Sequence, residues 1–441
     1  MKAVSLFSNC GAGDLGYRQA GFRFEIMAEL IPHRLDVALL NHPGAHGVKG
    51  DLRETWQALV DYYNEATNAE ELSFLAACPP CQGMSSNNSD RGNEDDPDAG
   101  SRDERNLLVG VIVNVAQSLS PKIIVVENVP AFLTRKVRHP MTQLPVSAAS
   151  WLLSALETDY AVFPILVNLK HYGVPQNRKR TFLTFIRRDV PGLTWLNENN
   201  LTPYPIPTHD LGYGGKKPIG LKAALQSFGL PILDARSKVS ARTTEEFANS
   251  NLHFVPVWTG LKYSMVAAIP PNSGKSAWDN DVCLNCGAVT LDPDAVVCSQ
   301  CDQLLPKPIV EEVDETYRLI KGYRSSSYRR MSPDEPAATI TTASGHVGSS
   351  RTIHFSENRL FSALECALLQ TFPEDFNWGD SLETVGHTNV RAMIGEAVPP
   401  LFTRLHGEVL VGLLNGERSE ALLPQEDERF KKATKRLQHE H

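Results

Sequence analysis

The chain has 441 residues, and its 51 acidic side chains outnumber its 43 Lys and Arg residues, which gives a formal net charge of −8. Proteins that coat DNA without sequence preference are usually basic, because neutralising phosphates supplies most of their affinity. The charge argues against that class, although it is compatible with an enzyme that gathers basic residues at one site. Hydrophobic residues make up 42% and charged residues 21%, which is typical of a folded chain with two or three domains.

No window of the sequence approaches the roughly 18 uninterrupted apolar residues of a membrane span. The start, MKAVSLFSNCGAG, lacks the apolar core of a signal peptide. We therefore expect a cytoplasmic protein without a membrane partner, and a monomer. Its eight cysteines are then metal ligands, nucleophiles or buried thiols rather than disulfides, because the cytoplasm keeps thiols reduced.

Short apolar runs alternate with stretches of helical period over the first 190 residues. Strands that alternate with helices predict an α/β fold with a doubly wound, Rossmann-like sheet, whose ligands lie outside the carboxyl ends of the strands. Strands are predicted at Lys2–Phe7, Arg23–Glu29, Leu72–Ala77, Lys122–Glu127 and Thr181–Arg187, and helical periods at Tyr17–Ala20 and Leu107–Leu119.

The composition and the periodicity of the sequence change after residue 190. Pro, Gly and Asn become frequent and helical periods fade until about Phe355, which predicts a small, irregular domain inserted at 191–356. Helical periods return at Leu360–Thr371 and Pro399–Leu414. We expect 1–190 and 357–415 to form one domain. The remainder, 416–441, mixes charges of both signs and is expected to be a charged C-terminal tail, either a solvated helix or frayed.

A turn of small residues, FSNCGAGDLG from Phe7 to Gly16, follows the first predicted strand. Such a turn lets the backbone approach a nucleotide-like ligand closely, although tight connections use the same residues. Glu29 ends the next strand about twenty residues later, where a carboxylate can accept hydrogen bonds from ribose hydroxyls. Asp51, followed by Leu52, could serve an adenine amino group in the same way.

The segment CPPCQGMS, from Cys78 to Ser85, follows an apolar strand and allows three functional interpretations. A redox dithiol would normally open a helix, whereas a loop rich in Gly and Ser follows here. Half of a zinc site would need a matching pair nearby. The third interpretation makes Cys81 a nucleophile at the carboxyl end of a strand, which requires a thiolate and a partner acid or base. Two inert thiols in a turn are the structural alternative.

Two further motifs place charged side chains at strand ends. Glu127, in the segment ENVP, ends an apolar strand at the rim where Cys81 is expected, and a carboxyl with apolar neighbours can act as an acid at neutral pH. After Gln176, Arg178 and Arg180 alternate at the start of a strand and are predicted to point to one face. There they could hold a base oxygen, a carboxylate or a phosphate. Taken singly, a helix cap and a solvated edge explain these motifs as well.

The order and spacing of these motifs resemble the cytosine-5 DNA methyltransferase family of bacterial restriction-modification systems. The resemblance covers about residues 1–190 and 329–415, in the family's linear order. It rests on the glycine turn, Pro80-Cys81-Gln82, Glu127-Asn128-Val129, Gln176-x-Arg178-x-Arg180, the segment RMSPDEPAATITT, which resembles the ninth motif, and Gly395-Glu396-Ala397-Val398-Pro399, which resembles the last.

The resemblance implies S-adenosyl-L-methionine as cofactor, cytosine in double-stranded DNA as substrate and a cognate restriction endonuclease as a companion. The implied roles are catalytic for Cys81, Glu127, Arg178 and Arg180, cofactor-binding for Phe7, Asn9, Cys10, Gly11, Ala12, Gly13, Glu29, Asp51, Leu52, Pro79, Leu108, Glu396 and Val398, and substrate-binding for Pro80, Gln82, Ser85, Asn128 and Gln176.

The chain departs from the family pattern at three of these positions. Asn9 and Ala12 stand where Gly is usual, and Glu396 stands where the family has an Asn that helps to hold the methionine end of the cofactor. A carboxylate at position 396 could meet the cofactor's ammonium or repel its carboxylate.

The implied reaction also fits the chemistry of the residues. Attack of the Cys81 thiolate on carbon 6 of cytosine activates carbon 5, while Glu127 donates a proton to ring nitrogen 3 and Arg180 contacts the base oxygen. Carbon 5 then accepts the methyl group, and elimination releases the enzyme. Because these atoms lie inside the duplex, the base must be flipped out. An RNA cytosine-5 methyltransferase of the same fold and a non-catalytic DNA-binding relative are the alternatives.

Two Cys-x-x-Cys pairs lie in the predicted insertion, Cys283 with Cys286 and Cys298 with Cys301. Two such knuckles in one short segment, 283–301, predict a tetrahedral, structural zinc site with four thiolates and no open position. Two surface dithiols are the alternative. A metal staple suits an irregular domain with few periodic apolar runs. In the family this region is the target-recognition domain, and the resemblance transfers no target sequence to it.

Basic residues gather in two segments that contain no acid. Lys170–Arg188 has six, and Arg318–Arg330 has five together with two tyrosines. The second segment predicts a strip that contacts phosphates, with an exposed linker as the alternative. Acidic residues gather instead at Asp90–Glu104, shortly after Cys81.

Overall fold

The structure is a computed structural model, and it describes residues 1–80, 107–139, 141–312, 316–321, 324–349 and 351–438. Cys81, Gln82, Ser85 and the acidic segment Asp90–Glu104 lie outside the described residues, so the roles expected for them stay expectations. None of the helices in the described ranges is long and apolar enough to cross a membrane.

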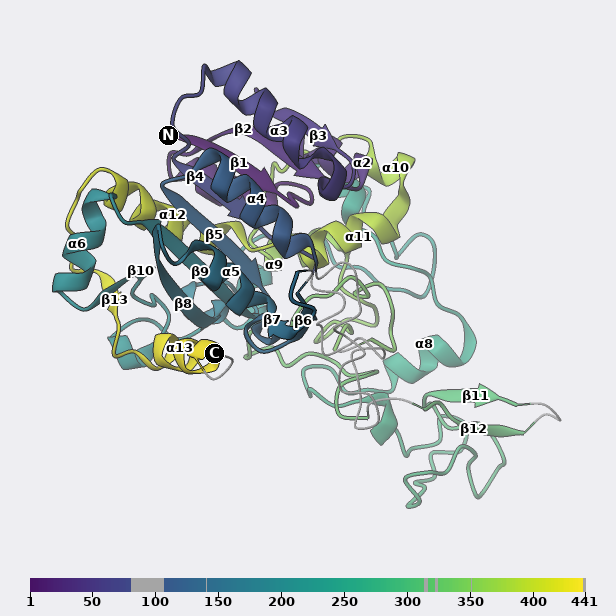
Figure 1. Ribbon diagram of the computed structural model, residues 1–441. Coiled ribbons are helices and arrows are strands. Elements are labelled where there is room, and N and C mark those ends of the chain that lie inside the picture. Colours follow the sequence, from purple (N-terminus) through teal and green to yellow (C-terminus); the bar gives the residue numbers. More distant parts are fainter. Residues whose placement is uncertain (81–106, 140, 313–315, 322–323, 350, 439–441) are drawn as a thin grey trace.

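A seven-stranded sheet forms the centre of the larger part of the molecule (Figure 1), with strand order β3-β2-β1-β4-β5-β9-β8. The first five strands run parallel, and β9 runs antiparallel to both of its neighbours. The five predicted strands agree with the structure to within two residues at each end. The strands are β1 (Lys2–Leu6), β2 (Arg23–Glu29), β3 (His46–Lys49), β4 (Phe74–Ala77), β5 (Ile123–Asn128), β8 (Tyr160–Asn168) and β9 (Lys179–Arg187).

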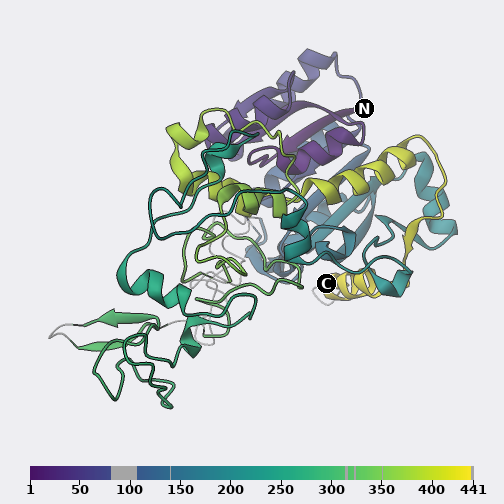
Figure 2. The ribbon, with the colours of Figure 1, turned by 180° about the vertical axis from the view of Figure 1, so that it is seen from behind.

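Helices cover both faces of this sheet, as the alternating pattern predicts. The face seen in Figure 1 carries α3 (Leu52–Thr67), α4 (Val109–Leu119) and α5 (Ala148–Leu156). The face seen in Figure 2 carries α1 (Ala12–Gln19), α2 (Pro32–Asn41) and α12 (Pro400–Leu414). Because helices bury both of its faces, a central strand such as β5 is buried at every position and is apolar without alternation.

Two segments pack on the sheet although the sequence placed them elsewhere. After residue 190, α6 (Pro191–Glu198) and β10 (Leu201–Pro205) bury Leu193, Leu196 and Tyr204 in the core beside the sheet. Near the end of the chain, β13 (Leu422–Pro424) pairs with β10, and α13 (Glu428–Gln438) buries Ala433 and Leu437. Residues 428–438 therefore form a helix, which is one of the two alternatives expected from their charges, and its two buried apolar side chains pack it against the rest of the molecule.

Between about residue 230 and residue 360 most of the chain forms an irregular lobe, drawn in teal and green at the lower right of Figure 1. A small apolar cluster around Trp258, Val266 and Ile353 forms its core. The lobe contains α8 (Gly260–Ala267), β11 (Ile309–Glu311) and β12 (Tyr317–Leu319), whereas α7 (Leu221–Gln226) packs against α9 (Ala363–Leu369). The remaining elements are α10 (Ser381–Thr384) and α11 (Gly386–Glu396), which together with α9 connect the lobe to α12, and the small pair β6 (Lys136–Arg138) and β7 (Pro145–Ser147).

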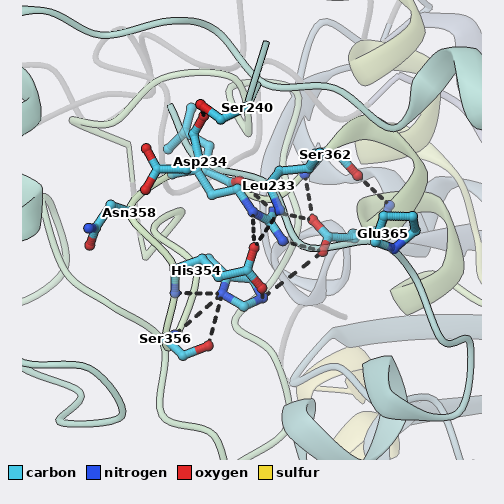
Figure 3. A network of polar contacts seen from close by, with 12 residues as sticks. Leu233, Asp234, Ser240, His354, Ser356, Asn358, Ser362 and Glu365 are labelled. Carbon is cyan, nitrogen blue, oxygen red and sulfur yellow. Dashed lines mark hydrogen bonds and ion pairs between the residues drawn. The ribbon is translucent and has the colours of Figure 1, made fainter. Parts of the chain in front are cut away.

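A buried polar network joins the lobe to α9, and part of it is seen in Figure 3. Arg359 donates to both oxygens of Glu365, at 2.6 and 2.8 Å, and through Nε to Glu357 at 2.7 Å. Glu365 also accepts from the backbone N–H of Ser362, which caps α9. Although burial alone would raise the pKa of Glu365, the adjacent Arg359 guanidinium outweighs it and holds that pKa at about 2. This end of α9 is thus fixed by charge rather than by apolar contact.

Candidate functional site

The turn after β1 is held in a conformation that most side chains avoid. Phe7 and Asn9 both have positive φ, at 59° and 48°, and Gly11 has φ of 75°. A Cβ at Gly11 would lie 2.9 Å from the ring of His42, whose Nε2 donates to the Gly11 carbonyl at 2.8 Å. Strained backbone of this kind persists where the surroundings fix it, and it is frequent at ligand sites.

Glu29, at the end of β2, closes this turn. Its carboxylate accepts from the backbone N–H of Asn9 at 2.9 Å and from that of Ile31 at 3.1 Å. Burial raises the pKa of Glu29. An ionised carboxylate has about four acceptor positions, so these two bonds leave capacity for a further donor.

A pocket opens between the turn, the carboxyl ends of β4 and β5, and the connection from α11 to α12. Six of the expected cofactor-binding residues line this pocket, namely Phe7, Asn9, Ala12, Gly13, Glu396 and Val398. The expected acid Glu127 lines it as well. Among the lining residues that the sequence did not single out are Cys78, Asp14, Tyr17, Phe182 and Thr403. Asp14 accepts from the Ser5 hydroxyl at 2.9 Å, and burial raises the pKa of Asp14 to about 7.

Other expected cofactor residues serve the fold around the pocket. Cys10 is fully buried, and burial raises the pKa of its thiol to about 12. Leu52 and Leu108 pack in the apolar core. Asp51 caps α3 by accepting from the Arg53 N–H and pairs with the Arg53 guanidinium at 2.6 Å. Gly11 and the buried Pro79 shape the backbone beside the pocket.

The structure brings Glu127 and Arg180 into direct contact. They come from the neighbouring antiparallel strands β5 and β9, whose register pairs Asn128 with Thr181. Arg180 Nε lies 2.8 Å from Glu127 Oε1, and the Cys78 thiol donates to Glu127 Oε2 at 2.8 Å. Glu127 is 6% exposed. A buried carboxyl group is thus held from both sides at the carboxyl ends of the strands.

Asn128 fixes the backbone just before the expected nucleophile. Its side-chain N–H donates to the carbonyl of Pro79 at 3.0 Å, and its oxygen accepts from the Val129 N–H at 2.8 Å. The described chain then continues through the half-buried Pro80 and stops at the residue before Cys81. Asn128 therefore connects the end of β5 with the segment that carries Cys81.

Arg178 and Gln176, for which the resemblance implies catalytic and substrate-binding roles, are both completely buried. The Arg178 guanidinium donates to the carbonyls of Ile340, Gly395 and Ala397 at 2.9 to 3.0 Å. Gln176 bonds to the Gln370 side chain and accepts from the Ile340 N–H. Because β9 begins only at residue 179, Arg178 precedes the strand and does not share a face with Arg180. Both residues hold the chain around the pocket, and the catalytic and substrate-binding roles that the resemblance implies for them stay predictions.

In Arg318–Arg330, the segment for which the sequence predicts a phosphate-contacting strip, several of the described guanidinium groups already have partners within the protein. Arg330 is completely buried, with acceptors on every side that include the carbonyls of Val266, Ile269 and His354. In the same segment Arg318 pairs with Glu312 and Arg324 with Asp294. In the first segment Arg187 pairs with Asp189 and Glu71, at the end of β9 remote from Glu127. Local acids and carbonyls outside each segment satisfy these guanidinium groups.

The four cysteines of the lobe come together as predicted. Their sulfur atoms all lie within 4.8 Å of one another, with 3.6 Å both between Cys283 and Cys301 and between Cys286 and Cys298. The two knuckles repeat one geometry, since the first cysteine of each donates its N–H to the carbonyl five residues later, at 2.8 Å. A tetrahedral zinc ion with Zn–S bonds of about 2.3 Å separates its sulfurs by roughly 3.8 Å. The arrangement therefore fits a four-thiolate metal.

Comparisons with known proteins agree with this geometry. Residues 1–410 match the family described as C-5 cytosine-specific DNA methylase. The chain is 26% identical over 408 residues to the Type II methyltransferase M1.HgaI of Avibacterium volantium, covering 90% of this chain and 94% of that protein. It is also 26% identical over 416 residues to the Type II methyltransferase M.DdeI of Desulfomicrobium norvegicum, covering 92% and 88%.

The fold alone is similar to the crystal structure of a chain described as a DNA modification methyltransferase encoded within a prophage of E. coli. The TM-score is 0.59 at 18% identity, over 94% of this chain and 99% of that one. Because the family match spans nearly the whole chain and both relatives are covered almost throughout, the protein belongs to the C-5 cytosine-specific DNA methylase family and is a DNA (cytosine-5-)-methyltransferase.

Proposed function

We propose that the protein methylates carbon 5 of cytosine in duplex DNA, with S-adenosyl-L-methionine as cofactor, by flipping the base out and forming a covalent adduct with Cys81. The observation that carries this proposal is the Glu127 carboxyl group, held by Arg180 at the end of the pocket that begins at the glycine turn. The names of the relatives, which are Type II methyltransferases, support DNA as the substrate.

The pocket suits a cofactor that joins a nucleoside to an amino acid. Its wall contains Asn9 Oδ1, a buried acceptor without a hydrogen-bond partner in the described ranges, and the Glu396 carboxylate. Beside the pocket, Glu29 retains acceptor capacity for ribose hydroxyls. When bound, the cofactor supplies an electrophilic methyl group. Phe7, Ala12, Gly13 and Val398 give the apolar and backbone surface against which it would rest.

In the proposed reaction the Cys81 sulfur forms a bond to carbon 6 of the flipped cytosine, and the electron pair of the C5–C6 double bond moves toward carbon 5. Glu127 carries the proton that passes to ring nitrogen 3, which keeps the ring neutral as the adduct forms. Arg180 both orients Glu127 and offers its guanidinium to the base oxygen. Once carbon 5 carries the methyl group, a solvent base would take the proton on carbon 5, and the electron pair of that C–H bond would restore the C5–C6 double bond as the Cys81 thiolate leaves. Nitrogen 3 would return its proton to Glu127, which restores both the base and the acid.

We also propose that the cysteine cluster binds one structural zinc ion and that the lobe around it, within 191–356, recognises the target sequence. Four thiolates at tetrahedral separations leave no position for a reactant. Connecting segments with little regular secondary structure commonly carry recognition, and most of this lobe is irregular.

The experiment offers labelled S-adenosyl-L-methionine with duplex DNA or matched RNA to the wild type and to Cys81→Ala. We expect label in DNA with the wild type alone, and an SDS-resistant complex with DNA that contains 5-fluorocytosine, because fluorine cannot leave carbon 5 as a proton does. Retained binding of S-adenosyl-L-homocysteine by Cys81→Ala serves as the folding control. Label in RNA instead would favour an RNA methyltransferase, and equal labelling of DNA by both proteins would refute the Cys81 adduct.

A further inference from the structure

Two positions at which the chain departs from its family's pattern lie together in the structure. Asn9, in the turn after β1, donates through Nδ2 to the carbonyl of Met393 at 2.9 Å. Met393 belongs to α11, which ends at Glu396. The side chains of Asn9 and Glu396 line the same pocket. Asn9 and Glu396, two departures from the family pattern, therefore lie on the same wall of the pocket.

Glu396 is fixed on this wall from behind. Arg34, in the first turn of α2, lies outside the pocket lining and donates through Nη1 to Glu396 Oε2 at 2.5 Å. The Arg34 side chain is 12% exposed and that of Glu396 is 31% exposed. The ion pair offsets the cost of placing a carboxylate in the pocket, and it restricts the directions in which that carboxylate can turn.

Two acceptors on this wall receive no hydrogen bond from the described residues. Asn9 Oδ1 is buried without a hydrogen-bond partner, and Glu396 Oε1 accepts no hydrogen bond, within the part of the chain that the structure describes. Glu29 adds a second carboxylate near Arg34, so two acidic groups surround one guanidinium. Unpartnered acceptors with an excess of negative charge favour a cationic donor, and an ammonium group offers three N–H bonds.

We propose that Glu396 and Asn9 together bind the α-ammonium of the cofactor's amino-acid end, with Arg34 positioning Glu396. This inference rests on the proposed function, since it takes S-adenosyl-L-methionine as the ligand. A carboxylate at position 396 can attract the cofactor's ammonium or repel its carboxylate. The inference favours attraction, because the ion pair with Arg34 offsets the negative charge that would repel the cofactor's carboxylate. Ammonium binding in this chain then replaces the Asn contact of the family by a charged one.

The test measures affinity, not turnover, by titration calorimetry with two ligands. One is S-adenosyl-L-homocysteine, and the other is its analogue that lacks only the α-amino group. For the wild type we expect S-adenosyl-L-homocysteine to bind roughly 10- to 100-fold more tightly, as a hydrogen-bonded charge pair gives. Glu396→Gln, which keeps the shape and removes the charge, should reduce this preference to a few-fold. Glu383→Gln, an exposed acid on α10, should leave it unchanged.

Asn9→Gly provides a second variant, since glycine accepts the positive φ of this position, and it should lower the preference by a smaller factor. Equal weakening of both ligands by Glu396→Gln, or tighter binding of S-adenosyl-L-homocysteine, would overturn the inference while leaving the proposed function intact. Failure of the wild type to bind either ligand would instead overturn the proposed function, and the inference with it.

Discussion

The sheet and the irregular lobe are stabilised by different interactions. Both faces of the sheet are buried under helices, and strands such as β5 contribute an apolar side chain at nearly every position. Around the cysteine cluster, by contrast, the only fully buried apolar neighbour in the described part of the chain is Leu305. A segment that cannot bury enough apolar surface must gain its stability elsewhere. We expect the cysteine module to gain it from a metal held by four thiolates, and the lobe also contains buried guanidinium groups with several acceptors each.

The largest difference between the two regions is expected when a metal bound by the four cysteines is removed. Structural zinc binds zinc-finger peptides with about 10–16 kcal/mol, so chelation or Cys298→Ser should unfold the cysteine module and leave the sheet folded. Metal analysis after gel filtration should give about one zinc per chain in the wild type. Hydrogen exchange should then rise in 281–305 but not in β5, and binding of S-adenosyl-L-homocysteine should persist. Much less than one zinc per chain would contradict the proposal.

The next largest effect is expected at the junction between the two regions. Arg359→Met would leave the buried Glu365 and the partly exposed Glu357 beside a neutral side chain, and breaking a buried pair in this way costs about 3–5 kcal/mol. The matched control is Arg404→Met, which removes an exposed pair with Glu408 on α12 and should cost less than about 0.5 kcal/mol. Urea unfolding of the three proteins measures both values. Equal losses of unfolding free energy in the two variants would show that the buried ion pair contributes no more to stability than the exposed one.

The difference between the regions also explains what the sequence could predict. Strands β1, β2, β4, β5 and β9 are continuous apolar runs, so their positions and the α/β class follow from the residues. Strand β8 escaped prediction because it contains Pro164, which is tolerated there since β8 lies at the edge of the sheet. Strand β3 is short, and its burial is only partial.

Roles of charged and polar side chains were harder to predict. Glu127 and Arg180 were singled out because they lie at strand ends, where parallel strands present their ligands. Arg178 and Arg330 look like surface cations in the sequence, but each donates to several carbonyls that come from distant segments. Such a role depends on tertiary contacts. The same holds for Arg34, whose partner Glu396 lies 362 residues away in the chain.

Lowering the pH should destabilise the protein, because the sheet region and the junction each contain a histidine that is neutral in the folded state. In the sheet region His406 contacts Tyr17 and Thr184 and stacks on Tyr204. Burial lowers the pKa of His406 to about 3, and burial likewise lowers that of His354 at the junction to about 3. In the unfolded chain a histidine takes up a proton below about pH 6.5.

The unfolded state therefore binds more protons, and stability falls as the pH drops from about 6.5 toward 3, by at most about 1.4 kcal/mol per pH unit for each such histidine. His406→Gln should lower the slope of unfolding free energy between pH 6.5 and 5 by up to that amount, whereas the exposed His346 gives a control whose replacement by Gln keeps the slope. Urea titrations at several pH values provide the measurement. An unchanged slope in His406→Gln would mean that this histidine is already protonated in the fold.

The smallest effect is expected when one hydrogen bond in the sheet region is removed, the bond from the Cys78 thiol to Glu127. The thiol donates a hydrogen bond to the Glu127 carboxyl group, and Arg180 forms an ion pair with it. A neutral hydrogen bond contributes about 0.5–1.5 kcal/mol, so Cys78→Ala should slow methyl transfer in single turnover roughly two- to tenfold, without changing cofactor affinity. Cys78→Ser keeps a donor at the same position and should recover most of the rate. If the Ala and Ser variants were equally slow, the thiol would act through its volume, and Arg180 alone would orient the acid.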